Sequence, residues 1–159
     1  FNGAVQHIAG TMTHTVQCGL DGCTETQTQN CTIENGVCKV CQHSYVLGNP
    51  SPVTRTVKDM GSDEATQAAA KALLPTTVNA PYGDADETVG CAVNWNDGAK
   101  NTNGSVVTWT FVGTFTAPEG GYVLAQGAGN VNATVTVKIE VEPADEKTPE
   151  ADSAEGQSE

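Results

Sequence analysis

The residues that could do chemistry are concentrated in the first 43 positions, which hold five of the six cysteines and all three histidines. The candidate metal ligands are His14, Cys18, Cys23, Cys31, Cys38 and Cys41. Two thiolates in a C-x-x-C turn, as in Cys38 and Cys41, can bind one tetrahedral Zn²⁺. Cys18 and Cys23 lie next to two glycines and can form a second, looser pair. We therefore predict a structural Zn²⁺ site in this segment.

The sequence does not choose among several ligand sets for this ion. Four thiolates from Cys18, Cys23, Cys38 and Cys41 would give the site a negative charge that no basic cluster in the chain balances. Neutral His14 in place of one thiolate would reduce that charge. The alternatives that include His14 or Cys31 therefore stay open.

Disulfide bonds are the competing interpretation, since six cysteines in an extracellular chain could form three of them. Cys91 lies on the apolar face of a predicted strand, so it is either a buried thiol or a partner for Cys31. We favour zinc for the N-terminal cluster because C-x-x-C is a poor disulfide framework and a good chelate. A redox-active pair is disfavoured because no strand-then-helix pattern surrounds it. A catalytic zinc is disfavoured because the cysteines suffice to close the coordination sphere.

The elements that follow must support this cluster. We predict a Cys/His-rich unit at 1–43, a connector at 44–75 and a β domain at 76–142. Within the connector, a helix is expected over 62–74, because Ser62 can cap it and the following acidic residues suit its N-terminal dipole. An alanine-rich stretch continues the helix, and Pro75 ends it.

Period-two patterns predict strands in the β domain. Apolar residues alternate with polar ones in three stretches: Cys91, Val93 and Trp95; Val107, Trp109, Phe111 and Phe115; and Val135, Val137, Ile139 and Val141. Glycine- and asparagine-rich turns separate these stretches. Short alternating strands between such turns predict a mainly β fold, an antiparallel β-sandwich.

Four segments of this region carry a resemblance to a known family. They are Leu74–Val78, Val93–Trp95, Trp109–Gly120 and Ala133–Val137. Together they resemble the bacterial immunoglobulin-like domains of the group 4 type, which are repeated in Gram-positive surface proteins and extracellular glycoside hydrolases. The resemblance covers roughly residues 73–142. It implies an immunoglobulin-like sandwich with a spacer or adhesion role, and it carries no catalytic residues.

The cysteine-rich segment is similar to small Cys/His-rich repeats of secreted proteins from Gram-positive anaerobes. The matching pieces are His14–Cys18, Cys23–Thr26, Cys31 and Asn35–Cys41. The resemblance implies a structural metal site or a disulfide-stapled knot. Metal would also help the segment fold, because forty residues with so few large apolar side chains cannot build a sufficient core.

Composition limits the classes of partner. The chain has 159 residues and a formal charge of −12, and its seven basic residues are scattered singly, so nucleic acid is excluded. No apolar run is long enough for a membrane span, and we expect no membrane insertion. Residues 143–159 are acidic and lack large apolar side chains, which predicts a disordered linker.

Exposed aromatic residues are the candidates for ligand binding. Tyr82 and Tyr122 lie near predicted turns and could stack on a sugar, whereas Trp95 and Trp109 face the predicted core. The acidic turn at 84–87 could hold Ca²⁺, but a solvated turn explains it better.

We therefore predict a non-catalytic structural or spacer module of a secreted or cell-surface bacterial protein, with neighbouring modules of a longer chain as its partners. The alternatives are an adhesion module that binds glycan or a host surface protein, and a subunit of a self-assembling surface fibre. An enzyme is not predicted, because no acid, base and nucleophile can be assembled from these residues.

Overall fold

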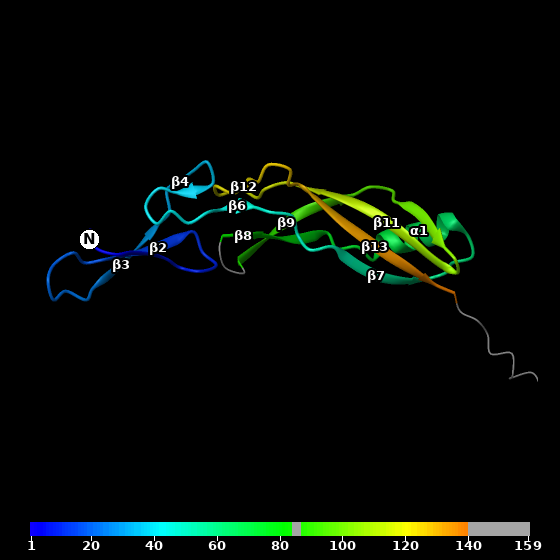
Figure 1. Cartoon of the computed structure of the whole chain (residues 1–159), viewed down its shortest axis with the longest axis horizontal. Coiled ribbons are helices and arrows are strands. Elements are labelled where there is room, and N and C mark those ends of the chain that lie inside the picture. The colour runs from blue at the N-terminus through cyan, green and yellow to red at the C-terminus, as the bar shows by residue number, and fades with distance from the viewer. Residues whose placement is uncertain (84–86, 140–159) are drawn as a thin grey trace, which may run out of the picture.

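The computed structural model describes residues 1–83 and 87–139, which form a mainly β structure with one helix (Figure 1). The molecule is elongated, with the cysteine-rich unit at one end and the helix at the other. The predicted linker at 143–159 lies outside the described residues, as do Asp84 and Asp86 of the acidic turn. The prediction of a mainly β fold with a short helix is confirmed for the part described.

The cysteine-rich end contains a three-stranded antiparallel sheet and a small hairpin. Its strands are β1 (Val5–His7), β2 (Thr13–Gln17), β3 (Thr26–Asn30), β4 (Ile33–Glu34) and β5 (Val37–Cys38). The hairpin turn between β4 and β5 needs positive φ at both central residues, and Asn35 and Gly36 supply it at 53° and 78°. This turn therefore sets the position of Cys38, which is the last residue of β5.

A six-stranded sheet forms most of the rest of the molecule, in the order β7-β13-β11-β9-β8, with β10 also paired to β11. Its strands are β7 (Val53–Lys58), β8 (Thr77–Tyr82), β9 (Glu87–Trp95), β10 (Ala99–Asn103), β11 (Val106–Phe115) and β13 (Asn130–Lys138). All pairs are antiparallel except β7 with β13, which run parallel. The segment predicted as a connector thus supplies an edge strand of this sheet.

Two further strands, β6 (Val46–Leu47) and β12 (Val123–Leu124), pair in parallel between the two ends of the molecule. The sheet curls because β9 pairs with β8 along most of its length and with β11 only at Val93–Trp95.

The helix α1 spans Asp63–Ala72 and begins where the sequence predicts. The Ser62 hydroxyl accepts a hydrogen bond from the Ala65 N–H, and Leu73 closes the C-terminus, so α1 ends before the predicted Leu74. The helix packs against β7 and β11 and buries Ala70.

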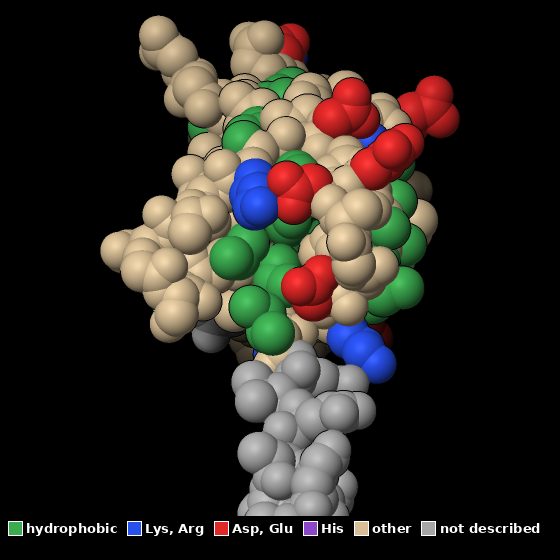
Figure 2. All heavy atoms as spheres, turned by 90° about the vertical axis from the view of Figure 1, so that its right-hand side faces the viewer, with side chains coloured by type: hydrophobic (Ala, Val, Ile, Leu, Met, Phe, Trp, Pro, Cys, Tyr) green, Lys and Arg blue, Asp and Glu red, His purple; other side chains and the backbone are tan. Residues whose placement is uncertain are grey.

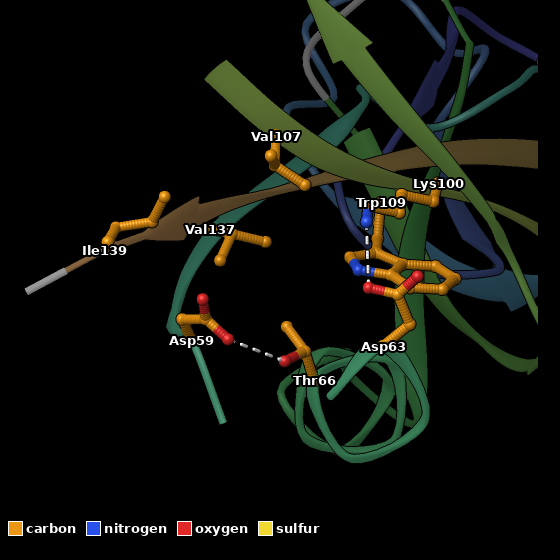
Figure 3. A pocket seen from close by; sticks show the side chains of 8 residues that line it. All are labelled: Asp59, Asp63, Thr66, Lys100, Val107, Trp109, Val137 and Ile139. Carbon is orange, nitrogen blue, oxygen red and sulfur yellow. Dashed lines mark hydrogen bonds and ion pairs between the residues drawn. The ribbon is translucent and has the colours of Figure 1, made fainter. Parts of the chain in front are cut away.

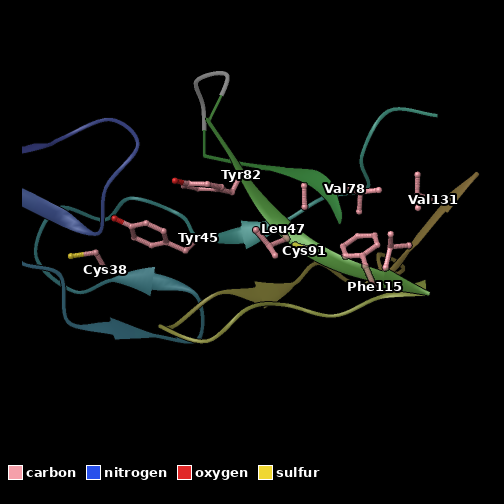
Figure 4. Close-up of a cluster of buried hydrophobic side chains, with 10 residues drawn as sticks. Cys38, Tyr45, Leu47, Val78, Tyr82, Cys91, Phe115 and Val131 are labelled. Carbon is pink, nitrogen blue, oxygen red and sulfur yellow. The ribbon is translucent and has the colours of Figure 1, made fainter. Parts of the chain in front are cut away.

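Two clusters of buried side chains hold these elements together. The first lies between α1 and the sheet and contains Val57, Ala70, Leu74, Trp109, Phe111, Ala133 and Val135. The second runs from Cys38 and Tyr45 through Leu47 to Phe115 and Val131 (Figure 4). Because the second cluster takes side chains from both ends, the cysteine-rich unit and the sheet share a continuous core.

The predicted alternation of buried and exposed side chains is observed in the middle of the sheet but not at the end of β13. Phe111 and Val135 are fully buried, as the period-two pattern requires. Ile139 lies beyond the last residue of β13 and is 56% exposed, so the predicted inward face does not extend to it. Val141 lies outside the described residues.

Candidate metal centre

Four of the predicted ligands converge in the cysteine-rich unit: His14, Cys31, Cys38 and Cys41, which we call the thiolate cluster. Their ligand atoms all lie within 4.8 Å of one another. His14 comes from β2, Cys31 follows β3, and the other two flank the turn after β5. His14 and Cys38 are fully buried. This group could hold a metal ion.

Three separations within the thiolate cluster are close to those of a tetrahedral zinc site. Cys31 Sγ lies 3.8 Å from Cys41 Sγ, and His14 Nδ1 lies 3.4 Å from Cys31 Sγ and 3.8 Å from Cys38 Sγ. Tetrahedral Zn²⁺ with its usual bond lengths sets two sulfurs about 3.8 Å apart and a sulfur and a nitrogen about 3.6 Å apart. The donor set therefore fits one ion at its centre.

The three thiols differ in acidity because their surroundings differ. Burial opposes ionisation of Cys38, but hydrogen bonds from the backbone of Cys41 and Val40 and from the neighbouring thiols lower its pKa to about 6. Burial raises the pKa of Cys31 to about 12, and it also raises the pKa of Cys41. Cys38 is thus prepared as a thiolate, whereas a metal must displace the protons of the other two.

The C-x-x-C turn positions its own sulfur atoms. The Cys41 N–H points at Cys38 Sγ, 3.5 Å away, and the Gln42 N–H donates to the Cys38 carbonyl. The Tyr45 hydroxyl contacts another ligand of the cluster. It donates a hydrogen bond to the Thr11 carbonyl at 3.0 Å and lies 3.4 Å from Cys31 Sγ. Metal sites commonly have such outer contacts, which orient the ligands.

Cys18 and Cys23 do not join the cluster, and their prediction as ligands needs correction. They form a disulfide with each other across the loop between β2 and β3. They are only five positions apart in the sequence, and their Cα atoms lie 5.8 Å apart. Among the ligand sets that the sequence left open, the structure assembles the one with both His14 and Cys31. Three thiolates and a neutral imidazole would leave a net charge of only about −1 on a bound Zn²⁺.

Cys91 is a buried thiol, and the alternative bond to Cys31 is not formed. It is 1% exposed and lies among the apolar side chains of the second core cluster, as its place on the inward face of β9 requires. Its Sγ points to the Val89 carbonyl at 3.6 Å.

Tyr82 is buried at the end of β8, whereas Tyr122 lies beside a turn as the sequence suggested but is only partly exposed. Tyr82 is 4% exposed, and its ring stacks on that of Tyr45 with centroids 5.6 Å apart. Tyr122 is half-buried, and its ring meets the edges of both. Both residues were predicted to be exposed because they lie near predicted turns. In the structure, the ring of Tyr82 contacts those of His43 and Tyr45, and the ring of Tyr122 contacts that of Tyr45. Both tyrosines pack against the ring of Tyr45, whose hydroxyl lies 3.4 Å from Cys31 Sγ. Trp109 is buried, as predicted, and Trp95 is partly buried.

Sequence reasoning missed a second group of ligand-type residues, formed by His7, His43 and Glu87. Glu87 is buried, and its Oε2 accepts hydrogen bonds from the Gly10 N–H at 2.7 Å and from His7 Nε2 at 3.0 Å. Burial opposes ionisation of Glu87, but the bonds from His7 and Gly10 prevail and lower its pKa. Period two offered a signal, since Glu87 shares the inward face of β9 with Cys91 and Val93.

The opposite end of the molecule carries exposed hydrophobic side chains among carboxylates (Figure 2). A small hollow of about 60 Å³ lies here between α1 and the sheet, beside the ion pair of Lys100 and Asp63 (Figure 3). A shallower groove of about 430 Å³ lies between β7 and β8. Neither is lined by Tyr82 or Tyr122, and the first is far smaller than a typical ligand pocket.

Among the described residues, no helix has the length and apolar character that a bilayer span requires. Comparison of the chain with protein-family models, curated proteins and solved structures finds no match. The geometry of the chain itself therefore carries the functional argument.

Proposed function

We propose that this chain is a non-catalytic structural module of a secreted or cell-surface bacterial protein, in which Zn²⁺ bound by the thiolate cluster fixes the cysteine-rich unit onto the β-sheet. The observation that carries the proposal is the convergence of three thiols and one imidazole at zinc-like separations inside a shared core. Its partners would be neighbouring modules of a longer chain.

The ligand chemistry favours zinc in a structural role. Thiolate-rich tetrahedral sites select Zn²⁺ over harder divalent ions, and four protein ligands close the coordination sphere. A closed site leaves no position for a substrate, which agrees with a role in stability. The residues around it are consistent with this, because the tyrosine rings fill the space beside the cluster.

The presence of both a disulfide and free thiols supports an oxidising environment, such as the outside of the cell. Cys18 and Cys23 are bonded, which is typical of secreted chains, whereas three neighbouring thiols of the cluster are free. Free thiols this close together would tend to oxidise outside the cell unless a metal ion held them. Zinc binding and an extracellular location are therefore compatible.

The immunoglobulin-like interpretation of residues 76–142 belongs to the same proposal. It is supported by alternating burial along β8, β9, β11 and β13, whose inward side chains meet in common clusters. A rigid β domain joined to a metal-stapled cap would suit a spacer that holds adjacent modules apart.

Cobalt substitution and native mass spectrometry test the metal site. We expect the protein to retain zinc in native spectra, and Co²⁺ bound in its place to show sulfur-to-cobalt charge-transfer absorption. Cys38→Ser should abolish this absorption, because it removes the thiol that is already prepared as a thiolate. The double variant Cys18→Ser/Cys23→Ser is the matched control and should keep it, since those cysteines lie outside the cluster.

Two outcomes would overturn the proposal. One is cobalt binding without sulfur charge-transfer bands in the native protein. The other is a mass that shows a second disulfide among Cys31, Cys38 and Cys41 in freshly purified protein without metal.

A further inference from the structure

A second cluster of potential ligands lies beside the thiolate cluster and shares none of its residues. His7 is the last residue of β1, His43 follows the C-x-x-C turn, and Glu87 is the first residue of β9. One ligand atom from each lies within 4.8 Å of the others. Three segments that are far apart in sequence therefore bring two imidazoles and a carboxylate to one point.

Hydrogen bonding accounts for only part of this arrangement. His7 Nε2 lies 3.0 Å from Glu87 Oε2 and is hydrogen-bonded to it. His43 Nε2 lies 2.9 Å from Glu87 Oε1, but this buried nitrogen has no hydrogen bond of acceptable geometry. The Glu87 carboxylate therefore faces both imidazole nitrogens, with a hydrogen bond to one and a close contact with the other.

The two imidazole rings are stacked face to face. Their centroids are 3.5 Å apart and their planes differ by 7°. Both rings direct Nε2 at the same carboxylate. Because a metal ion binds in the plane of each imidazole, one ion shared by both Nε2 atoms would turn the rings out of this parallel stack.

Gly83 lets the backbone pass close to these ligand atoms. Gly83 has φ +73°, and a Cβ placed on it would lie 2.8 Å from His43 Nε2 and 3.2 Å from Glu87 Oε1. A side chain at Gly83 would therefore collide with the His43 ring, which lies directly against this glycine.

Outer contacts hold the ligands in place, as in other metal sites. The Tyr45 hydroxyl lies 3.4 Å from His7 Nδ1, on the side of the ring away from Glu87. The Gly10 N–H donates to Glu87 Oε2 at 2.7 Å and fixes the carboxylate. Tyr45 thus lies between the two clusters, since its hydroxyl also contacts Cys31 Sγ at 3.4 Å.

We propose that His7, His43 and Glu87 form a second metal site, distinct from the thiolate cluster, that binds a divalent transition-metal ion such as Zn²⁺. Two imidazoles and a carboxylate suit Zn²⁺ and its neighbours in the first transition row. Three protein ligands leave at least one coordination position for water or an external donor. The ion would join β1, the turn after β5 and the start of β9, and so attach the cysteine-rich unit to the sheet at a second point.

Metal stoichiometry tests the proposal separately from the proposed function. Zinc titration followed by native mass spectrometry should show two bound ions in the unmodified protein. Glu87→Gln and His7→Ala should each retain one ion, because each removes a ligand from the second site only. Their Co²⁺ forms should keep the sulfur-to-cobalt absorption, which shows that the thiolate cluster and the surrounding fold are intact.

A matched control is Glu34→Gln, which changes an exposed carboxylate that pairs with Lys39 and should leave two ions bound. Cys38→Ser should lose the sulfur-bound ion and keep the other. The proposal is overturned if the unmodified protein binds one ion that Cys38→Ser removes. It is also overturned if the second ion persists in both Glu87→Gln and His7→Ala. Loss of the cobalt–sulfur absorption in the unmodified protein would instead contradict the proposed function.

Discussion

At the scale of single residues, the six cysteines show how surroundings decide chemistry. Cys18 and Cys23 are near neighbours in one loop and form a disulfide. Cys38 lies in a turn whose backbone N–H groups point at its sulfur, and its pKa falls to about 6. Cys91 lies in an apolar core, where burial raises the pKa of its thiol. The same side chain is thus a crosslink, a candidate ligand or an inert core group.

Cys91 gives a prediction about pH. Its folded pKa is above the ordinary value of 9.0, so between these two values the unfolded chain holds fewer protons than the folded one. Stability from this group is therefore complete below the unfolded pKa and falls as the pH rises towards the folded pKa. The loss should be about 1.4 kcal/mol per pH unit in that window.

Urea denaturation at a series of pH values checks this effect. As the pH rises above the ordinary thiol pKa of 9.0, the free energy of unfolding should fall more steeply in the unmodified protein than in Cys91→Ala. The other thiols and the tyrosines titrate in both proteins, so only the difference in slope is attributed to Cys91. Parallel curves for the two proteins would contradict the assignment.

At the scale of elements, local signals placed the helix and several strands, and close packing refined them. Ser62 and the acidic residues after it fix the start of α1. In β11, Gly113 lies where a Cβ would come within 2.6 Å of Val93 Cγ2 and 2.9 Å of the Trp95 ring. This glycine lets the Trp95 ring pack close against β11, so its small size has a packing reason.

Substitution of Gly113 tests that reason. Gly113→Ala should lower the free energy of unfolding by about 1–3 kcal/mol, because the added methyl group overpacks the contact with Val93 and Trp95. Gly90→Ala in β9 is the matched control, since the nearest atom to its added Cβ is 4.0 Å away. That variant should change stability by no more than about 0.5 kcal/mol in either direction. Equal losses for the two variants in urea denaturation would refute the packing argument.

At the scale of the whole molecule, the cysteine-rich unit and the sheet form one continuous structure. The second core cluster takes Cys38 and Tyr45 from one end and Phe115 and Val131 from the other. The ligand-type residues lie where these parts meet, because Glu87 of β9 contacts His7 and His43 of the cysteine-rich unit. A metal ion bound at the thiolate cluster should therefore also raise the free energy of unfolding of the sheet.

Chelation tests this coupling. Both tryptophans, Trp95 and Trp109, lie in the sheet, so their fluorescence reports on the part of the molecule away from the thiolate cluster. Removal of zinc with a chelator should lower the midpoint of the tryptophan unfolding transition, because an ion that binds only the folded state stabilises everything that unfolds with its site. In Cys38→Ser, the midpoint of the tryptophan unfolding transition should already be lowered without chelator. Adding the chelator should then change that midpoint much less than in the unmodified protein. An unchanged midpoint in the unmodified protein would mean that the two parts unfold independently.

The sequence by itself determined the local features of this protein. Alternation of apolar residues predicted the mainly β class, the cap and alanine run predicted α1, and the C-x-x-C pair predicted a metal-type cluster that includes Cys38 and Cys41. These features depend on residues only a few positions apart, so local sequence patterns are enough to predict them. The immunoglobulin-like interpretation and the extracellular location remain predictions.

Only the tertiary structure decided which distant residues meet. It placed Cys18 with Cys23, selected His14 and Cys31 for the thiolate cluster, and buried Tyr82 against Tyr45. It also paired β7 with β13 in parallel and brought Glu87 to His7, 80 residues away. No local pattern fixes such contacts, because they arise when separate segments close around a common core and the chain between them contributes only its length.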